Sequence, residues 1–346
     1  MELRYLSVGC ADAIHILLPG PGGRDQHILV DSGSERGDYP GTLRQEMEAI
    51  AARGESIDRW IITHIDDDHI GGLLRFLSDT PLRNQLPLDH TEIWFNYCEP
   101  DPGLRLGNRE KKSVGQAIRL RDYLRANSRL SEQLTTDSRP AAIGELQFTL
   151  LSPTAAKLEQ LAAQWQLEEE SRTARQQKSA RQSDYGIRLE AFDPDTQGTD
   201  PNVFNGSSIA CLLDYRGKRV LLTGDSHPEV LVAQLKALGY ADADDRRLVL
   251  DHLQLAHHGS EANTSAELLR LIDCRRFVIN ANGIKHNLPN KRLLARLRAC
   301  YPGQQLQVYL THDNRFTRSI LAVDQPLQDL ELIFPPAGQK YISLSL

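Results

Sequence analysis

The feature that most constrains this chain is a cluster of histidines and aspartates between Thr63 and Gly72, in the run THIDDDHIGG. The cluster follows the apolar residues 60–62, which predict a short buried strand. A turn at the end of a strand lets side chains at offsets 0, 2, 4 and 5 converge on one point, whereas a continuing strand would place them in a row. We therefore expect a metal site where this strand ends.

Two imidazoles and two carboxylates in this turn are the expected metal ligands: His64, Asp66, Asp68 and His69. Mixed nitrogen and oxygen ligands suit Zn, Mn or Fe, and carboxylate enrichment shifts the preference towards the harder Mn. The alternative for a single residue of this kind is a surface or capping role, and Asp67 or Asp68 is well placed to cap a following helix. So many ligand types within a few residues favour the metal site.

Further candidates stand at the ends of later apolar runs. Asp225 follows residues 221–224, where a carboxylate is suited to bridge two metals, although a single aspartate there is more often a turn or cap residue. His257 and His258 precede Gly259, which permits a tight turn. We expect His258 to face the metals and His257 to support it or face solvent. His286 stands in a loop, where a metal-centre role and a plain loop position are about equally expected. The other histidines are expected to be structural or at the surface: His15, His27, His90, His227, His252 and His312.

Composition narrows the class of protein. The 346 residues, 40% hydrophobic and 25% charged, are enough to bury a large core in one domain or two. A net charge of -6 argues against a surface that is basic throughout and grips long nucleic acid. Five scattered cysteines without a CxxC pair suggest neither disulfides nor a thiolate zinc site. With no signal-peptide pattern and no membrane-length apolar run, we expect a cytoplasmic protein without membrane contact.

Two segments differ in composition from the rest. Residues 103–135 predict a basic helical insertion, whose plainer interpretation is a solvated helix face and whose sharper one is a basic wall for a phosphate-bearing substrate. Its basic residues are Arg105, Arg109, Lys111, Lys112, Arg119, Arg121, Arg125 and Arg129. Residues 168–203 are polar and predict a loop or partly disordered insertion, more readily inert than a lid.

The order of the remaining elements predicts the fold class. Apolar runs at 3–8, 13–18 and 27–30 read as an antiparallel meander, after which strands and helices follow one another with polar residues at strand ends. This order suits an α/β (α+β) fold in which two mixed sheets form an αββα sandwich with outer helices. We found no internal repeat.

These motifs resemble a known family. THIDDDHIGG resembles the THxHxDHxGG signature of metallo-β-lactamase-fold hydrolases, and residues 223–225 (TGD) resemble the bridging-aspartate motif of that superfamily. Closer still is the likeness to the metallo-hydrolase domain of ComEC-type DNA-uptake proteins. Residues 6–13 resemble its LDVGQGDA opening, 31–33 its D-x-G, and 205–209 its N-x-x-S-[IV]; 256–260 and 282–286 also correspond. The likeness spans residues 3 to about 300, without the membrane channel.

The resemblance implies one metallo-β-lactamase-like domain over residues 1–346, with the two insertions as additions, and two divalent metal ions, Zn or Mn. His64 and Asp66 would hold the first metal and Asp68, His69 and His258 the second. Asp225 would bridge them, and a hydroxide between them would be the nucleophile. Asp68 and His286 are the expected catalytic pair, with Lys285 and Ser260 available to stabilise charge on the substrate. Asp31 and His257 are expected to support the ligands or the substrate.

Two departures from the superfamily pattern bear on the metal. Asp66 stands where most members have a second histidine, and residues 150–154 lack the histidine of the third motif. Both changes make the first metal site richer in oxygen.

The sequence thus predicts a metal-dependent hydrolase, with a phosphodiesterase or nuclease as the first choice and DNA, RNA or a nucleotide as substrate or partner. One alternative is an acyl hydrolase that opens a lactone, thioester or β-lactam. The other is a non-catalytic binding or regulatory subunit that retains the fold. The sequence leaves the substrate, pathway, physiological metal and oligomeric state open.

Overall fold

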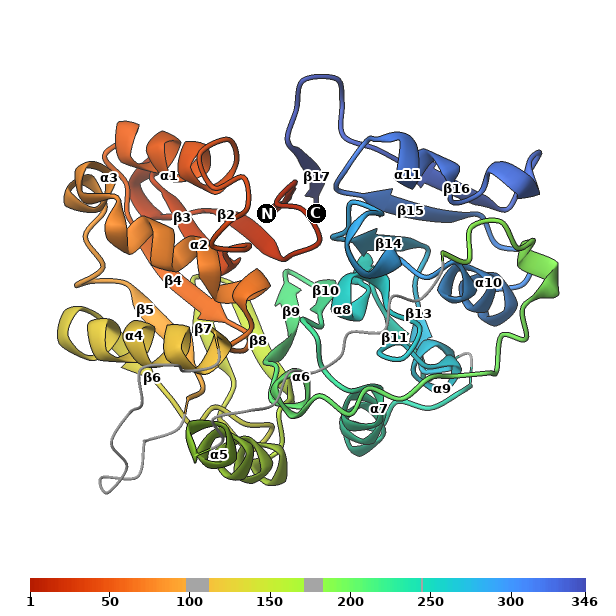
Figure 1. The fold of residues 1–346 in the computed structure, drawn as a ribbon, viewed down its shortest axis with the longest axis horizontal. Coiled ribbons are helices and arrows are strands. Elements are labelled where there is room, and N and C mark those ends of the chain that lie inside the picture. The colour runs from red at the N-terminus through yellow and green to blue at the C-terminus, as the bar shows by residue number, and fades with distance from the viewer. Residues whose placement is uncertain (98–111, 171–182, 244) are drawn as a thin grey trace.

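Two β-sheets lie at the centre of the protein in this computed structural model, with helices on the outside (Figure 1). The structure describes residues 1–97, 112–170, 183–243 and 245–346. The first sheet has seven strands, in the order β17-β1-β2-β3-β4-β5-β6. Their bounds are Glu2–Leu6 (β1), Ala13–Pro19 (β2), Asp25–Asp31 (β3), Ile57–Ile62 (β4), Glu92–Phe95 (β5), Arg129–Ser131 (β6) and Tyr341–Ser345 (β17).

The first sheet is mixed. β17, β1, β2 and β3 pair antiparallel, which confirms the predicted meander, and β3 to β6 pair parallel. Because β17 returns to pair with β1, both ends of the chain lie in this sheet (Figure 1). The carboxyl ends of the neighbouring parallel strands β3 and β4 carry Asp31 and Thr63, where two of the sequence motifs meet.

The second sheet has eight strands, in the order β16-β15-β14-β12-β10-β9-β8-β7. Their bounds are Ala141–Ile143 (β7), Leu146–Ser152 (β8), Ala210–Tyr215 (β9), Lys218–Leu222 (β10), His252–Gln254 (β12), Arg276–Ile279 (β14), Leu306–Leu310 (β15) and Leu330–Ile333 (β16). The strands β7 to β10 pair antiparallel and β10 to β16 parallel, so this sheet is also mixed. A separate pair joins β11 (Leu248–Val249) to β13 (Ile272–Asp273).

Helices lie outside both sheets (Figure 1). Beside the first sheet are α1 (Leu43–Ala52), α2 (Asp67–Ser78), α3 (Thr80–Gln85) and α4 (Lys112–Asn127). Beside the second are α7 (Pro228–Ala237), α9 (Ala266–Arg270) and α10 (Lys291–Cys300). The helix α5 (Ala155–Glu170) contributes Leu158, Leu161 and Trp165 to the apolar layer outside the first sheet. Shorter pieces are α6 (Val203–Gly206), α8 (Ala256–Gly259), α11 (Arg315–Ser319) and the 3-10 turns Pro21–Gly23, Leu189–Ala191, Lys285–Asn287 and Ala322–Asp324.

Three apolar layers hold the sandwich together. Trp94 of β5 meets Phe148 of β8 edge to face between the sheets, with ring centroids 5.4 Å apart. Trp60 of β4 packs on Phe76 of α2 in the layer outside the first sheet. Phe277 of β14 lies in the corresponding layer outside the second. Each such fully buried side chain contributes about 1.5–3 kcal/mol relative to an exposed one. This is the αββα arrangement that the sequence predicts.

The described end of the polar insertion lies along α10. Lys291, which is fully buried, donates to the main-chain oxygen of Tyr185 at 3.1 Å. Arg296, also fully buried, donates to the main-chain oxygens of Pro194 at 2.9 Å and Thr196 at 2.7 Å. Hydrogen bonds from α10 to main-chain oxygens therefore fix the position of residues 183–203. The polar composition of this segment does not predict such bonds. Residues 171–182 of the predicted insertion lie outside the described residues.

The basic segment forms α4 from residue 112 onward, and the part of it before residue 112 lies outside the described residues. Arg119 and Arg125 are exposed, whereas Arg121 is buried and donates to Asp122 at 2.7 Å. Arg121 is therefore not part of an exposed basic wall.

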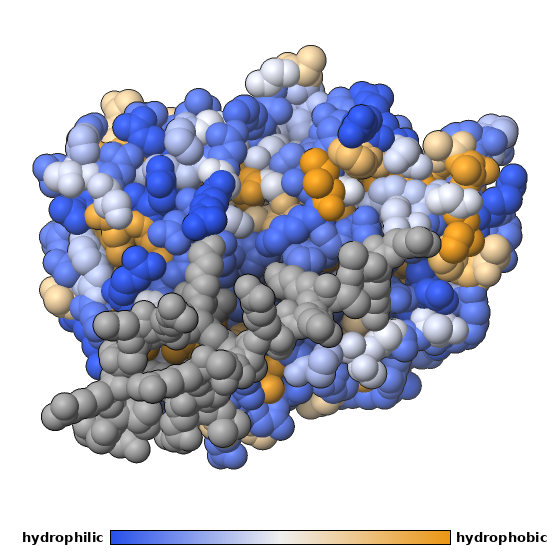
Figure 2. Space-filling model, in the orientation of Figure 1, coloured by the Kyte–Doolittle hydropathy of each residue, from blue (hydrophilic) through white to orange (hydrophobic). Residues whose placement is uncertain are grey.

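The face of the molecule seen in Figure 2 is largely hydrophilic, with small separate apolar areas. The large apolar side chains that are exposed are Ile187, Leu238, Val249, Ile284 and Val323. Among the described residues, none of the helices combines the length and the apolar character of a membrane span.

Candidate metal centre

The histidine and aspartate cluster forms the turn between β4 and α2. Asp66 takes the N-cap position of α2, and Asp67 and Asp68 lie in its first turn, where the helix dipole favours negative charge. A Cβ on Gly71 would come within 1.9 Å of Glu35 N, and one on Gly72 within 1.9 Å of Ser32 O. The two glycines therefore let α2 pack tightly against the loop after β3, which brings the cluster close to Asp31.

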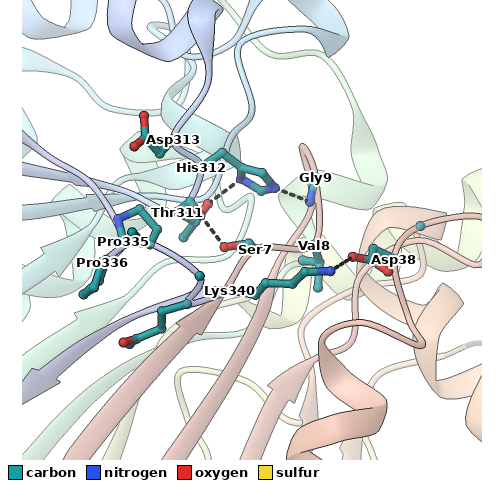
Figure 3. A pocket seen from close by; sticks show the side chains of 14 residues that line it. Ser7, Val8, Gly9, Asp38, Thr311, His312, Asp313, Pro335, Pro336 and Lys340 are labelled. Carbon is teal, nitrogen blue, oxygen red and sulfur yellow. Dashed lines mark hydrogen bonds and ion pairs between the residues drawn. The ribbon is translucent and has the colours of Figure 1, made fainter.

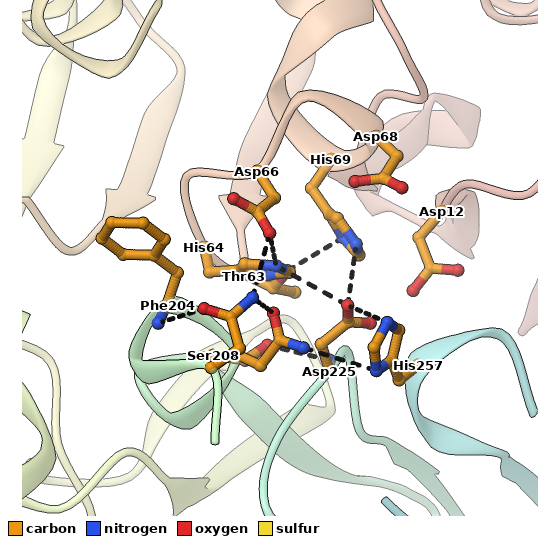
Figure 4. Close-up of polar contacts among 12 residues, drawn as sticks. Asp12, Thr63, His64, Asp66, Asp68, His69, Phe204, Ser208, Asp225 and His257 are labelled. Carbon is orange, nitrogen blue, oxygen red and sulfur yellow. Dashed lines mark hydrogen bonds and ion pairs between the residues drawn. The ribbon is translucent and has the colours of Figure 1, made fainter. Parts of the chain in front are cut away.

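Two imidazoles of the cluster face one carboxylate (Figure 4). The Nε2 atoms of His64 and His69 lie 3.7 Å and 3.5 Å from Asp225 Oδ2, and all three side chains are buried. Neither Nε2 atom has a hydrogen-bond partner among the described residues. Metal–nitrogen and metal–oxygen bonds are about 2.0–2.2 Å long, so separations of this size suit ligands on either side of one ion. His64, His69 and Asp225 thus fit a metal site.

The Nδ1 atoms of the two rings, on the side away from Asp225, are held by Asp31 at the end of β3 and by Thr63. Asp31 Oδ2 lies 2.8 Å from His69 Nδ1 and accepts a hydrogen bond from Thr63 Oγ1 at 2.8 Å. Thr63 Oγ1 lies 3.1 Å from His64 Nδ1, so it accepts from that ring. Asp31 therefore fixes both rings with Nε2 turned towards Asp225, the support that metal-bound histidines commonly have. The supporting role predicted for Asp31 in a metal centre stays a prediction.

A second pair of facing candidate ligands is His258 and Asp68. His258 Nε2 lies 3.8 Å from Asp68 Oδ2, and its ring centroid is 5.5 Å from that of His69. His258 Nδ1 lies 3.4 Å from Asp12 Oδ1. Asp12 is held in turn by Gln254 and Asn280, each donating at 2.8 Å. Asp12 thus faces the Nδ1 atom of His258, as Asp31 faces the Nδ1 atom of His69.

Asp12 was not among the predicted site residues. The only signal for it in the sequence was its place in the opening motif, since 242 residues separate it from Gln254, to which it is hydrogen bonded. The described sets of at least three ligand atoms within 4.8 Å of one another are His64, His69 and Asp225, and Asp12, Asp31 and His69. Asp12 therefore belongs to the same buried network as the predicted ligands.

The backbone of α8 turns two successive imidazoles towards the centre. His257, His258 and Gly259 all have positive φ, at 49°, 55° and 81°. A Cβ on Gly259 would lie 2.6 Å from Pro289 Cβ, so this position needs glycine. His257 Nε2 lies 3.8 Å from Asp225 Oδ2, on the side of Asp225 opposite His64 (Figure 4). His257 therefore lines the centre itself.

The other predicted residues lie at the rim. Asp66 Oδ2 is 3.9 Å from His64 Nε2 and accepts from Asn202 Nδ2 at 3.4 Å. Lys285 Nζ donates to Asp68 Oδ2 at 2.9 Å, and its side chain is 43% exposed. His286 is exposed one residue further along the same loop. The Ser260 hydroxyl accepts from Ala262 N at 3.3 Å, which assigns it to the turn after α8.

The charges in the centre oppose one another. Burial, together with the charge of His69, lowers the pKa of His64 to about 4. Burial alone would lower the pKa of His69, but Asp225 and Asp31 hold it well above its usual range. Burial would raise the pKa of Asp225, but His257 and His69 keep it well below its usual range. Asp225 is therefore ionised at neutral pH, the form in which a carboxylate binds a metal.

The loop that carries Asp12 also lines a surface pocket of about 500 Å³ (Figure 3). Ser7, Val8 and Gly9 form one wall, and His312 accepts from Gly9 N at 3.0 Å. Pro335 and Pro336 form part of another wall, and Lys340 pairs with Asp38 at 2.7 Å. None of the residues facing Asp225 lines this pocket, so it is separate from the metal centre.

Comparison with known proteins gives one family match and several distant structural matches. The family model of the metallo-β-lactamase superfamily matches residues 20–130, which include β3, β4 and the histidine and aspartate turn. A search of curated proteins gave no match. Similar solved structures include the metallo-β-lactamase fold protein YhfI from Bacillus subtilis, at 12% identity, 99% coverage of this chain, 98% of that chain and a TM-score of 0.42. Unliganded yeast PDE1 is 12% identical, with 100% and 99% coverage and a TM-score of 0.44.

The fold assignment rests on the family match and on the two mixed sheets with their outer helices. The chain has the fold of the metallo-β-lactamase superfamily. His64 and His69 of the buried histidine and aspartate set lie within the residues that the family model matches.

Proposed function

We propose that the protein is a metal-dependent phosphodiesterase or nuclease with a two-metal centre. The proposed ligands are His64, Asp66, Asp68, His69, Asp225 and His258. The observation that carries the proposal is the pair of buried Nε2 atoms of His64 and His69, which have no hydrogen-bond partner among the described residues and face the ionised Asp225. Buried polar atoms left without a partner are costly, and bound metal would satisfy them.

Divalent ions bound there would supply a water molecule of lowered pKa and would withdraw charge from the substrate. The chain's own residues orient that centre. Asp31 holds the ring of His69, and Asp12 Oδ1 lies 3.4 Å from the outer nitrogen Nδ1 of His258. Lys285, at the exposed rim beside Asp68, is suited to bind a substrate oxygen that carries negative charge.

The chemistry of the ligand set favours a phosphodiester. Asp66 makes the first site richer in oxygen, which suits hard ions such as Mn. Lys285 and the neighbouring His286 offer groups for an anionic substrate at the same rim. The resemblance of residues 6–13 to the ComEC-type opening, which now includes the network residue Asp12, supports the same choice. Nucleic acid or a nucleotide is the proposed substrate class.

The test is hydrolysis of bis-p-nitrophenyl phosphate by the purified protein after addition of Mn or Zn, beside a lactone substrate. Asp225→Ala is the inactive variant, and Asp137→Ala, which changes an exposed aspartate, is the matched control. We expect metal-dependent phosphodiester cleavage that is lost in Asp225→Ala and kept in Asp137→Ala. Cleavage of the lactone alone would instead identify an acyl hydrolase, and bound metal without either reaction would favour a non-catalytic role.

A further inference from the structure

We propose that Asp200, at the end of the polar insertion, is a positioning residue of the metal centre that acts through His257 and Asn202. This inference rests on the proposed metal-dependent function. It gives a role to a segment that carries no recognisable motif.

The carboxylate of Asp200 is held by three donors. Its side chain is 9% exposed, and Oδ2 accepts from Asn205 Nδ2 at 2.7 Å and from Asn263 Nδ2 at 2.8 Å. Its Oδ1 accepts from the main-chain nitrogen of Asn202 at 2.9 Å. These bonds join the insertion to α6 and to the loop after α8. The carboxylate is thus fixed in one orientation.

Asp200 also faces the outer nitrogen of His257. His257 Nδ1 lies 3.5 Å from Asp200 Oδ2 and 3.1 Å from Asn263 Oδ1, and both oxygens are acceptors. Asn205 Nδ2 also lies 3.3 Å from His257 Nδ1, but it makes the shorter bond of 2.7 Å to Asp200 Oδ2. A proton on Nδ1 satisfies them and leaves Nε2 directed at Asp225, 3.8 Å away. His69 with Asp31 and His258 with Asp12 show the same arrangement, a carboxylate outside and the inner nitrogen towards the centre.

A second connection runs to Asp66. Asn202 Oδ1 accepts from Phe204 N at 3.0 Å, which fixes its amide so that Nδ2 is the donor to Asp66 Oδ2 at 3.4 Å. Asp66 stands where the superfamily signature has histidine. The insertion therefore supports the centre at Asp66, the position where the proposed ligands depart from the signature.

The insertion is anchored from its far side as well. Arg296 of α10 donates to the main-chain oxygens of Pro194 and Thr196, and also to that of Glu261 at 2.7 Å. One buried guanidinium thus ties the segment before Asp200 to the loop that leads to Asn263. This anchoring keeps Asp200 in place behind His257.

The experiment compares metal binding by the full-length wild-type protein and by Asp200→Asn. Mn²⁺ affinity is measured by equilibrium dialysis, and the visible spectrum of the Co²⁺-loaded protein reports ligand geometry. Loss of an outer-shell partner typically weakens metal binding about 10–100-fold, and we expect a loss in this range with a changed Co²⁺ spectrum. Asp195→Asn, in the same segment with a 67% exposed side chain, is the control and should stay within about twofold.

A double-mutant cycle with His257→Ala separates positioning from general loss of stability. If Asp200 acts through His257, Asp200→Asn weakens Mn²⁺ binding less in the His257→Ala background than in the wild type. Wild-type affinity and spectrum in Asp200→Asn, whatever its stability, would overturn the inference and leave the proposed function intact. Fully multiplicative losses in the double variant would also overturn it. A wild-type protein that binds none of Mn²⁺, Zn²⁺ and Co²⁺ would overturn the proposed function and this inference with it.

Discussion

Two buried histidine pairs, both lying beside carboxylates, differ in how their ring nitrogens are used. In the pair on β2 and β3, His15 Nδ1 lies 2.8 Å from Glu46, His27 Nε2 lies 2.8 Å from Glu55, and the two rings are joined at 2.9 Å. In the pair after β4, the Nε2 atoms of His64 and His69 stop 3.5–3.7 Å from Asp225.

The difference lies in spacing rather than in composition. Separations of 2.8–2.9 Å are hydrogen bonds and leave no room for an ion. The longer separations around Asp225 match two ligand bonds that meet at one metal. A cluster of buried histidines and carboxylates is therefore a structural network when every nitrogen is hydrogen bonded, and a candidate metal centre when the inner nitrogens are not. The predictions below test this distinction.

The largest expected effect comes from the matched variants His69→Gln and His27→Gln, which alter equally buried rings. His69→Gln should lower metal-dependent hydrolysis by more than the roughly 10–100-fold typical of an outer-shell loss, because it removes a ligand. His27→Gln should leave metal content and turnover per folded molecule unchanged. Metal analysis and kinetics on both variants check this, and equal losses in the two would abolish the distinction.

Removal of metal should lower the stability of the folded protein. A ligand present at 100 times its Kd stabilises the state that binds it by about 2.7 kcal/mol. We expect a chelator to shift urea unfolding of the wild type and of His27→Gln by a similar amount, and to leave Asp225→Ala unaffected. Unfolding curves with and without chelator give the answer. An unchanged wild-type curve would mean that no metal is bound.

The hydrogen-bonded pair should matter for stability alone. His15→Gln removes the ring that joins Glu46 to His27. Glu46 keeps its bond from Arg4, but the buried Nδ1 atom of His27 loses its partner, which costs about 1–3 kcal/mol. Urea unfolding measures this loss, and metal analysis should show wild-type content. Loss of metal from the folded His15→Gln protein would show that the two pairs are coupled.

The last prediction concerns a buried histidine outside both pairs. His252 Nε2 lies 2.8 Å from the Tyr5 hydroxyl, and burial lowers the pKa of His252 to about 3. Below pH 6.5 this histidine is protonated in the unfolded chain, whereas in the folded protein it stays neutral until about pH 3. The free energy of unfolding therefore falls as the pH falls from about 6.5 towards 3. His252→Gln should flatten that fall. His90→Gln, with a 76% exposed ring, should follow the wild type in unfolding measured from pH 7 to pH 4.

The parts of this structure that could be predicted from sequence are the locally encoded ones. The turn after β4 was predictable because its histidines and aspartates lie within a few residues and its glycines are set by the close contact of α2 with the loop after β3. The strand ends at Asp225 and His258 were predictable because apolar runs stop there. The sandwich followed from the order of these elements.

Long-range pairings were not predictable in this way. Asp12 and His258 are brought together only when the first sheet packs on the second, and nothing local in either segment records the pairing. Asp200 lies in a stretch whose polar composition resembles disorder, yet Arg296 holds it through main-chain oxygens that any sequence would offer. Arg121 counted as a surface charge in the sequence although its side chain is buried.

The most direct test of the central distinction is anomalous diffraction from crystals grown with Mn²⁺ or Zn²⁺. We predict density between Asp225 and the Nε2 atoms of His64 and His69, none between His15 and His27, and loss of the first peak in Asp225→Ala. Absence of metal at Asp225 in the wild type, or metal bound at His15 and His27 instead, would contradict the account.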